Sequence, residues 1–289
     1  MSSSEKGSSL PIGAIIRENT LLRDRARAKT LGQNFLTDPT ILRRIVQAAG
    51  SLEEQAVLEI GPGPGGLTRE ILRGRPARFV AVEKDPHCVE ALTPLASQYP
   101  EWTLVEGDML TLDLEQVWSL SGGKRWHIIA NLPYNVGTEI LIRLLQEIGH
   151  LEGLTLMFQK EVADRLVASR GSSDYSRLSV LTQAFTRVRR VMTLPPGAFI
   201  PPPKVFSTVV HLTPRRETNL ALWAPLDRVL RAAFQSKRKM IRHSLQAVWP
   251  GSALLDVLGC CGLRPESRPE DLSVDDFLHL AQCLQSQHE

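Results

Sequence analysis

Short apolar segments alternate with helical patterns along the first half of the chain, and this alternation limits the possible folds more than any other feature. Five segments have the length and apolar content of buried strands: 56–60, 78–82, 102–106, 126–130 and 154–158. A helix is expected before the first strand, because Asp38 and Pro39 form a typical helix start and Gly50 a typical end. Strands and helices alternating at this spacing form parallel βαβ units. The sequence therefore predicts an α/β fold with a doubly wound sheet.

The pattern changes near residue 187. Two further strands are predicted at 187–194 and 208–212, with prolines bracketing the loop between them. After Pro214 only helical patterns remain, at 220–230, 231–248, 253–258 and 274–284. We therefore predict a mostly parallel seven-stranded sheet followed by a small all-helical C-terminal domain. The expected parts are a serine-rich disordered tip (1–20), an α/β domain (21–214) and a helical domain (215–289).

Composition excludes several classes of protein. The 289 residues are 43% hydrophobic and 22% charged, and no apolar run is long enough to span a bilayer. The serine-rich start has no apolar core, which argues against a secretory signal. The four cysteines form no C-x-x-C pair, so the sequence predicts no metal site. These features favour a cytoplasmic protein with reduced thiols, and a monomer is the default expectation because no oligomer interface is evident.

The net charge of +3 conceals an uneven distribution. Residues 31–159 hold 10 basic and 16 acidic side chains, whereas residues 160–216 hold 10 basic and 3 acidic ones. The acidic segment suits a nucleoside ligand bound by carboxylates, and the basic segment suits a phosphate backbone. Charge alone leaves both segments open to a simpler interpretation as solvated surface.

A glycine-rich segment follows the first predicted strand, with the spacing Gly61-x-Gly63-x-x-Gly66. Glycine permits a tight turn and lets a ligand approach the backbone closely. Glu83 ends the second predicted strand about 20 residues later, where a carboxylate can accept hydrogen bonds from both hydroxyls of a ribose. This pair fits a nicotinamide dehydrogenase as well as a methyltransferase.

The next two strand ends distinguish between these classes. Asp108 follows the third predicted strand, where its carboxylate can bind the exocyclic amine of an adenine. A role as a helix cap explains the residue equally well. The tetrapeptide Asn131-Leu132-Pro133-Tyr134 follows the fourth. Its proline restricts the backbone, so that the Asn131 side-chain oxygen and a neighbouring carbonyl can accept both N–H groups of a planar amine, while Tyr134 stacks on the base. Such an arrangement predicts methyl transfer to a base and requires no catalytic histidine.

These residues carry a resemblance to a known family. Over residues 20–284 the chain resembles the ribosomal RNA adenine N6,N6-dimethyltransferases of the small-subunit (16S) type, which are Rossmann-like class I methyltransferases. The motifs that carry the resemblance are Leu31-Gly32-Gln33-Asn34-Phe35-Leu36, Glu59-Ile60-Gly61-Pro62-Gly63, Asn131-Leu132-Pro133-Tyr134, Phe158-Gln159-Lys160-Glu161-Val162, Pro201-Pro202-Pro203-Lys204-Val205 and Phe234-Gln235-Ser236-Lys237-Arg238-Lys239.

The resemblance implies specific roles for residues of this chain. An S-adenosylmethionine site without a metal is expected at Asn34, Leu36, Gly61, Gly63, Glu83, Asp108 and Asn131. The target base is expected between the Asn131–Tyr134 segment and Phe199, a second stacking face. RNA contacts are expected from Arg187, Arg189, Arg190 and Lys204, and from a helix that carries Lys237, Arg238, Lys239 and Arg242.

The resemblance also implies a substrate, namely two adjacent adenosines in the 3′-terminal hairpin loop of 16S rRNA. Each adenosine would receive two methyl groups within a partly assembled small subunit, as a step of ribosome biogenesis.

Other functions stay open on the sequence alone. The nearest alternative is a large-subunit rRNA methyltransferase of the macrolide-resistance type, although the 201–205 loop and the long C-terminal domain favour the small-subunit type. A DNA adenine methyltransferase would more often carry two prolines in the tetrapeptide. A dehydrogenase has no use for Asn131 and Tyr134, and a non-catalytic assembly factor has no need for Glu83 and Asp108.

Overall fold

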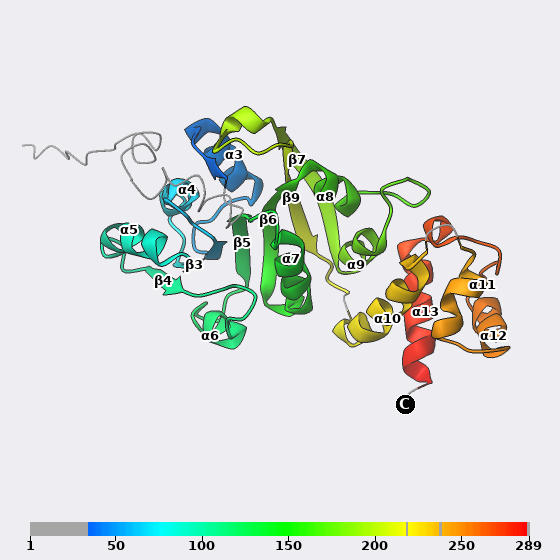
Figure 1. Cartoon of the computed structure of the whole chain (residues 1–289). Coiled ribbons are helices and arrows are strands. Elements are labelled where there is room, and N and C mark those ends of the chain that lie inside the picture. Colours follow the sequence, from blue (N-terminus) through cyan, green and yellow to red (C-terminus); the bar gives the residue numbers. More distant parts are fainter. Residues whose placement is uncertain (1–33, 218, 237–238, 288–289) are drawn as a thin grey trace, which may run out of the picture.

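The computed structural model describes residues 34–217, 219–236 and 239–287 (Figure 1). The predicted disordered tip, residues 1–20, lies outside the described residues, as do Lys237 and Arg238. Within the described ranges no helix is long and apolar enough to cross a membrane.

A seven-stranded sheet forms the centre of the molecule, in the order β4-β3-β2-β5-β6-β9-β7. Its strands β2 to β6 pair in parallel, and β9 runs antiparallel between β6 and β7, which confirms the mostly parallel doubly wound sheet. The bounds are β2 (Ala56–Ile60), β3 (Arg78–Glu83), β4 (Trp102–Glu106), β5 (Trp126–Asn131), β6 (Leu151–Gln159), β7 (Thr186–Leu194) and β9 (Ser207–Pro214).

Helices cover both faces of this sheet (Figure 1). One face packs against α3 (Pro39–Ala48), α4 (Gly66–Arg73) and α5 (Pro86–Ala96) through residues such as Val57 and Phe79. The other face packs against α6 (Leu114–Ser119), α7 (Gly137–Gln146), α8 (Lys160–Leu166) and α9 (Arg177–Phe185) through residues such as Leu58 and Ile128. Strands of an inner parallel sheet are buried on both faces, which explains why their sequences are continuous apolar runs.

The predicted start of α3 is confirmed. Asp38 is its N-cap and accepts the Thr40 N–H at 2.7 Å, and Pro39 occupies the first turn. The helix buries the stripe Leu42, Ile45 and Val46 against the sheet.

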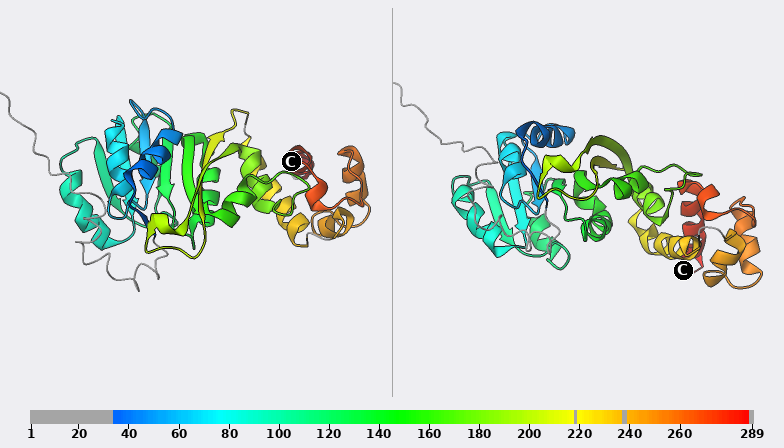
Figure 2. Two further views of the ribbon diagram at one scale, coloured as in Figure 1. Left: turned by 90° about the horizontal axis from the view of Figure 1, so that it is seen from above. Right: turned by 45° about the horizontal axis from the view of Figure 1, so that its top comes forward.

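The described elements after Pro214 are all helical, and they form a lobe at one end of the molecule (Figures 1 and 2). Its α-helices are α10 (Trp223–Phe234), α11 (Ile241–Ser244), α12 (Ala253–Cys260) and α13 (Val274–Ser286). The lobe shares one hydrophobic core with α9 and the sheet, because Leu226 and Phe277 belong to the same buried cluster as Val180.

One prediction for this lobe is wrong, because residues 231–248 do not form a single helix. Helix α10 ends at Phe234, and α11 begins only at Ile241. The backbone N–H of Ile241 donates to the Ser267 carbonyl at 2.8 Å, and that of Arg242 to the Pro265 carbonyl at 3.2 Å. These long-range partners replace the bonds that a continuous helix would make, and the helical periodicity of the sequence does not reveal them.

A two-stranded pair outside the main sheet was not predicted. Strand β1 (Phe35–Leu36) pairs antiparallel with β8 (Phe199–Ile200), so that the 34–36 segment is held beside the loop before β9. Two-residue strands carry too little sequence pattern to be predicted.

The sheet order places a ligand site between β2 and β5. Strand order reverses there, because β3 and β4 lie on one side of β2 and β5 and β6 on the other. The loops that leave such a switch point turn in opposite directions and open a crevice at the carboxyl ends of the strands.

Candidate active site

A cleft of about 320 Å³ lies at this carboxyl edge. It is lined by residues that follow four neighbouring strands: Gly61 after β2, Glu83 at the end of β3, Asp108 after β4 and Asn131 at the end of β5. Leu132, Pro133 and Tyr134 continue the lining toward α7. The structure therefore gathers most of the residues that sequence analysis assigned to the donor site and the target base.

The glycine turn after β2 depends on Gly63. Its φ of 55° lies in the left-handed region, and a Cβ there would stand 2.6 Å from Cε1 of Phe35. A side chain at this position would therefore clash with a ring that lines the cleft. The Gly63 N–H points instead to the Oε2 atom of Glu83, at 2.9 Å.

Glu83 connects two loops of the cleft. Its Oε2 accepts the Gly63 N–H, and its Oε1 accepts the Asp85 N–H at 2.8 Å. Burial raises the pKa of this carboxyl, while hydrogen bonds from the backbone N–H groups of Gly63, Lys84 and Asp85 oppose the shift. A carboxylate offers about four lone-pair positions, so Glu83 can still accept a hydrogen bond from a ligand in the cleft.

Asp108 caps a turn, which is one of the two roles that its position in the sequence left open, and it also lines the cleft. Its Oδ1 accepts the Leu110 N–H at 2.9 Å, as in a turn cap, and its Oδ2 accepts the Lys84 ammonium at 2.8 Å. These bonds hold the pKa of Asp108 below its ordinary value, with the Lys84 hydrogen bond as the largest cause. The residue stays ionised at the cleft wall beside the apolar side chain of Met109.

Asn131 is oriented by a contact that sequence analysis did not predict. Its side-chain nitrogen donates to the main-chain carbonyl of Asn34 at 2.7 Å. Because a carbonyl can only accept, the amide nitrogen must face Asn34, and the Asn131 Oδ1 is left as the acceptor for a ligand. The partner is a backbone atom 97 residues away, so no side-chain signal marks it.

Tyr134 is fixed through its hydroxyl group, which shares a hydrogen bond with the Oγ of Ser207 at the start of β9. Burial raises the pKa of this phenol, so it stays neutral. The ring lines the cleft, and the hydroxyl contact limits its rotation. A fixed aromatic ring beside an amide acceptor is suited to hold a planar base.

Phe199, the predicted second stacking face, does not line the cleft. The side chain is 2% exposed and packs in the hydrophobic cluster beneath β1. It is fixed there because Phe199 pairs with Leu36 in the β1–β8 ladder. Leu36 is also buried and lines a small adjoining cavity of about 30 Å³ instead of the main cleft.

The predicted RNA-contacting residues are dispersed. Arg187, Arg189 and Arg190 are exposed on β7, the edge strand of the sheet, and Lys204 is exposed on the loop before β9. Arg190 pairs with Asp164 at 2.5 Å, and Arg189 donates to the Ala48 carbonyl at 2.8 Å. Lys239 is exposed between α10 and α11, and Arg242 lies near Glu266 at 3.5 Å.

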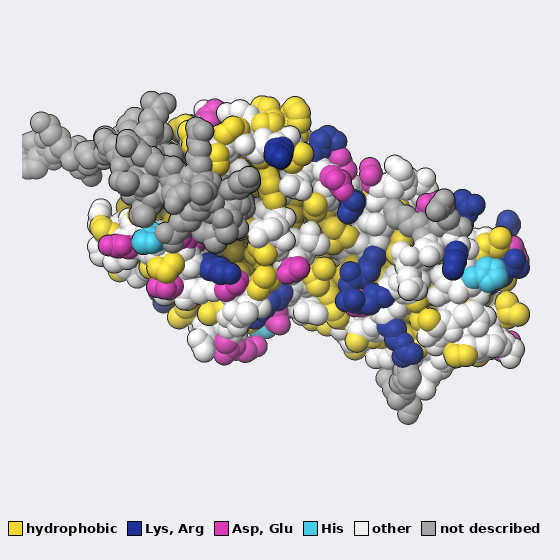
Figure 3. Space-filling view, in the orientation of Figure 1, with side chains coloured by type: hydrophobic (Ala, Val, Ile, Leu, Met, Phe, Trp, Pro, Cys, Tyr) yellow, Lys and Arg dark blue, Asp and Glu magenta, His cyan; other side chains and the backbone are white. Residues whose placement is uncertain are grey.

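The pairing of two arginines at the base of the helical lobe was not predicted. Figure 3 shows Lys and Arg side chains gathered over α9 and α10. Arg177 of α9 and Arg231 of α10 both pair with Asp227, at 2.5 and 2.7 Å. One carboxylate therefore holds two guanidinium groups from different helices, a pairing that only the tertiary fold creates.

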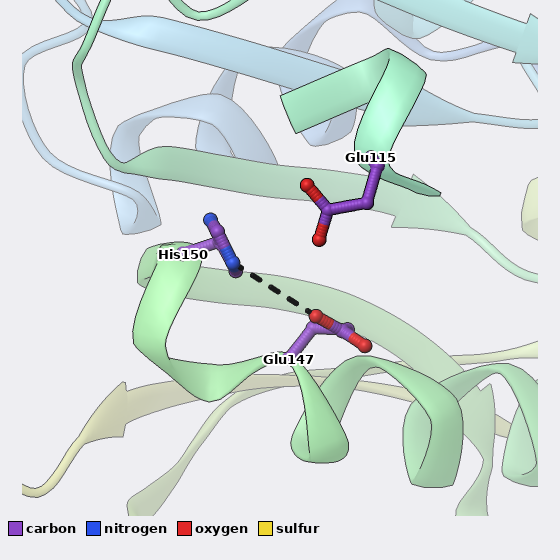
Figure 4. Close-up of side chains that lie close together, drawn as sticks. All are labelled: Glu115, Glu147 and His150. Atoms are coloured by element: carbon purple, nitrogen blue, oxygen red, sulfur yellow. Dashed lines mark ion pairs between the residues drawn. The ribbon is translucent and has the colours of Figure 1, made fainter. Parts of the chain in front are cut away.

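One group of potential metal ligands lies apart from the cleft. The ligand atoms of Glu115, Glu147 and His150 lie within 4.8 Å of one another (Figure 4), and the His150 ring stacks on Trp118. His150 immediately precedes β6, so the group lies at the amino edge of the parallel strands, opposite the cleft. It can take no part in chemistry at Asn131.

Two partly buried histidines, His127 and His211, do not line the cleft. Burial lowers the pKa of His211 to about 4, and its Nδ1 lies 2.9 Å from the Thr155 hydroxyl. Burial also lowers the pKa of His127. Neither residue lines the cleft, so neither provides a base for a reaction there.

The buried carboxyl of Glu59 beneath the cleft gives a testable pH dependence. Burial raises its pKa to about 8, and the Thr68 hydroxyl donates to its Oε2 at 2.7 Å. The folded protein therefore keeps a proton that the unfolded chain loses above the ordinary pKa of 4.5, so this residue makes the protein less stable as pH rises.

A glutamine at this position cannot ionise. As pH rises from about 5 to about 8.5, the free energy of unfolding of Glu59→Gln should therefore increase relative to that of the wild type by roughly a few kcal/mol. Urea unfolding at the two pH values measures this difference. A difference that does not change with pH would show that Glu59 is ionised in the fold.

The sheet order, with β9 antiparallel in an otherwise parallel arrangement, and the cleft at the carboxyl edge define a Rossmann-like methyltransferase. The model of the family described as ribosomal RNA adenine dimethylase matches residues 24–286. The chain therefore belongs to the ribosomal RNA adenine dimethylase family.

Similar proteins agree with this assignment. The chain is 47% identical over 257 residues to a "Ribosomal RNA small subunit methyltransferase A" of Chelativorans sp. (strain BNC1), covering 88% of this chain and 91% of that protein. A solved dimethyladenosine transferase from Plasmodium falciparum is 28% identical with a TM-score of 0.77, covering 88% of this chain and 98% of that one. The 23S rRNA methyltransferase ErmE is 26% identical with a TM-score of 0.65, covering 87% and 100%.

Proposed function

We propose that this enzyme transfers methyl groups from S-adenosylmethionine to N6 of two adjacent adenosines in the 3′-terminal hairpin loop of 16S rRNA. Relatives at 42–47% identity carry the name small subunit methyltransferase A, which favours the small subunit as the substrate. The observation that carries the proposal is the Asn131 carboxamide, fixed by the Asn34 carbonyl beside the Tyr134 ring.

The cleft residues fit the proposed methyl donor. Glu83 is 3% exposed and faces a cleft whose size suits a nucleoside, and its free lone pairs can accept ribose hydroxyls. The ionised Asp108 can accept the amine of the donor's adenine, between the apolar side chains of Met109 and Ile140. When bound, S-adenosylmethionine supplies an electrophilic methyl group on a sulfonium.

Positioning of the target amine is the main contribution of the protein to the reaction. Asn131 Oδ1 accepts one N–H of the adenine amine. The Pro133 carbonyl already accepts the Gly137 N–H at 2.9 Å at the start of α7, so we assign the second N–H to the Leu132 carbonyl. Two acceptors favour a pyramidal nitrogen, whose lone pair is then less delocalised and more nucleophilic. Alignment of this kind can contribute up to about 7–11 kcal/mol.

Proton removal requires no dedicated base. The methylated amine is cationic and therefore acidic, and it can release its proton to water. Among the described residues that line the cleft there is no histidine, in agreement with this route. Loss of the proton leaves a neutral secondary amine with one N–H, which one of the two acceptors can hold for a second methyl transfer, and the resulting cation again releases its proton to water.

The proposal is tested with labelled S-adenosylmethionine and small subunits that lack the modification. We expect the label in N6,N6-dimethyladenosine at two neighbouring positions of 16S rRNA after digestion and nucleoside analysis. A parallel reaction contains large subunits instead. Label in 23S rRNA alone would favour the activity named for ErmE, and tight subunit binding without label would favour a non-catalytic assembly factor.

We further propose that residues 215–289 form an RNA-recognition domain and that the predicted basic residues contact phosphates. Changing Lys237, Arg238 and Lys239 together to alanine should weaken binding to small subunits. It should also reduce the slope of log affinity against log salt by about 2–3, since each lost phosphate contact removes about 0.7–0.9. Binding measured at several salt concentrations tests this. Lys124→Ala, an exposed change at the amino edge of the sheet, is the control.

A further inference from the structure

The loop before β9 exposes an unusual amount of apolar surface. Ile200, Val205 and Phe206 are 39, 43 and 49% exposed. Six large hydrophobic side chains are exposed in the part of the chain that the structure describes, and half of them lie on β8 and the loop that follows it. In Figure 3 several hydrophobic side chains lie along the top of the molecule, where the loop passes near α3 in Figure 1. An exposed cluster of this kind usually marks a binding surface.

The loop lies at the catalytic edge of the sheet. Asn131 at the end of β5 pairs with Met157 of β6, and two residues further along, Gln159 pairs with Ser207 of β9. The start of β9 therefore lies just beyond the carboxyl ends of the parallel strands. Ser207 also contacts the Tyr134 hydroxyl, so Phe206 is one residue along the chain from a partner of the proposed base platform.

The backbone at Phe206 is fixed on both sides. Its carbonyl accepts the Lys160 N–H at 2.8 Å, and the next residue, Ser207, is fully buried in the sheet. Pro201, Pro202 and Pro203 precede it, and each proline ring restricts φ. An aromatic side chain on a restrained loop loses little conformational entropy when it binds a ligand.

A cation accompanies the aromatic ring. Lys204 is exposed two residues before Phe206, within the segment 160–216 that holds 10 basic and 3 acidic residues. Single-stranded nucleic acids are commonly bound by aromatic rings that stack on bases and by cations that contact the adjacent phosphates. The loop therefore has the composition of a nucleotide subsite, and it is linked to the cleft lining through the hydrogen bond between Ser207 and Tyr134.

We propose that Phe206, supported by Val205, is a stacking subsite for a nucleobase adjacent to the target adenosine, and that Lys204 contacts the phosphate between them. This inference rests on the proposed function. An adenosine that enters the Asn131–Tyr134 site leaves the base stack of its hairpin loop, and the neighbouring unpaired base then loses one stacking partner. The Phe206 ring replaces that partner.

The test compares Phe206→Ala and Phe206→Trp with wild type on unmethylated small subunits. We expect Phe206→Ala to raise the KM for subunits about 5- to 100-fold, the range for loss of one base–aromatic stack, and to change kcat less than about 3-fold. Phe206→Trp should restore KM to within about 3-fold of wild type, because it retains a stacking face. Affinity for S-adenosylmethionine should be unchanged, since Phe206 does not line the cleft.

Leu120→Ala is the matched control, because Leu120 is 40% exposed but precedes β5 at the amino edge of the sheet. The subsite is refuted if Phe206→Ala keeps the wild-type KM, if Phe206→Trp does not restore it, or if Leu120→Ala raises it equally. Wild-type enzyme that methylates no small-subunit RNA would instead refute the proposed function and the subsite together, so the two failures are distinguishable.

Discussion

Asn131→Ala is expected to lower kcat for methyl transfer by about 10²–10³-fold, the usual cost of removing one well-placed hydrogen-bonding group from an active site. The alanine removes the acceptor for the adenine amine and also releases the Asn34 carbonyl, which the wild-type side chain holds at 2.7 Å. Single-turnover rates with labelled S-adenosylmethionine and unmethylated small subunits measure the effect.

Two companion variants separate positioning from folding. Asn131→Asp keeps acceptor oxygens but has no N–H for the Asn34 carbonyl, so its kcat should also fall by at least about 10-fold. Asn135→Ala changes a neighbouring exposed asparagine at the cleft rim and should cost less than about 10-fold. Thermal melting of all three should stay near wild type. An active Asn131→Ala enzyme would disprove the proposed mechanism.

The parallel sheet and most of the cleft could be predicted from the sequence, for one physical reason. Buried parallel strands are continuous apolar runs, and the polar residue that ends each run must lie at the carboxyl edge. Glu83, Asp108 and Asn131 each end or follow such a run, so their convergence follows from the fold class alone.

Features that depend on tertiary contacts could not be predicted. The Asn34 carbonyl that orients Asn131 is a backbone atom, which has no signature in the sequence. Phe199 was expected to stack on the target base, but its pairing with Leu36 buries it. The helix predicted over 231–248 is interrupted because residues after Met240 bond to the 265–267 segment. In each case the deciding partner is distant in the sequence.

Glu83→Gln is expected to lower the affinity for S-adenosylmethionine by about 10²-fold, since a hydrogen bond to a charged group is worth about 1.5–3 kcal/mol and at least one such bond is lost. In the wild type each carboxylate oxygen accepts one backbone N–H, from Gly63 and from Asp85. A glutamine has one oxygen, so its NH₂ group must face one of these donors. The NH₂ group and the backbone N–H repel each other, which displaces one loop of the cleft. The variant also lacks a charged acceptor for the ribose.

Calorimetric titration with S-adenosylmethionine measures the loss, and Asp85→Asn is the matched control. Asp85 lies in the same loop and caps α5 by accepting the His87 N–H at 3.1 Å, a bond that asparagine can also accept. The affinity of Asp85→Asn for S-adenosylmethionine should stay within about 3-fold of wild type, because asparagine is an equally good cap.

Burial raises the pKa of Glu83, so wild-type affinity should also fall at mildly acid pH as the carboxylate is protonated, whereas Glu83→Gln should show no such dependence. If Glu83→Gln binds S-adenosylmethionine with wild-type affinity, Glu83 does not belong to the donor site.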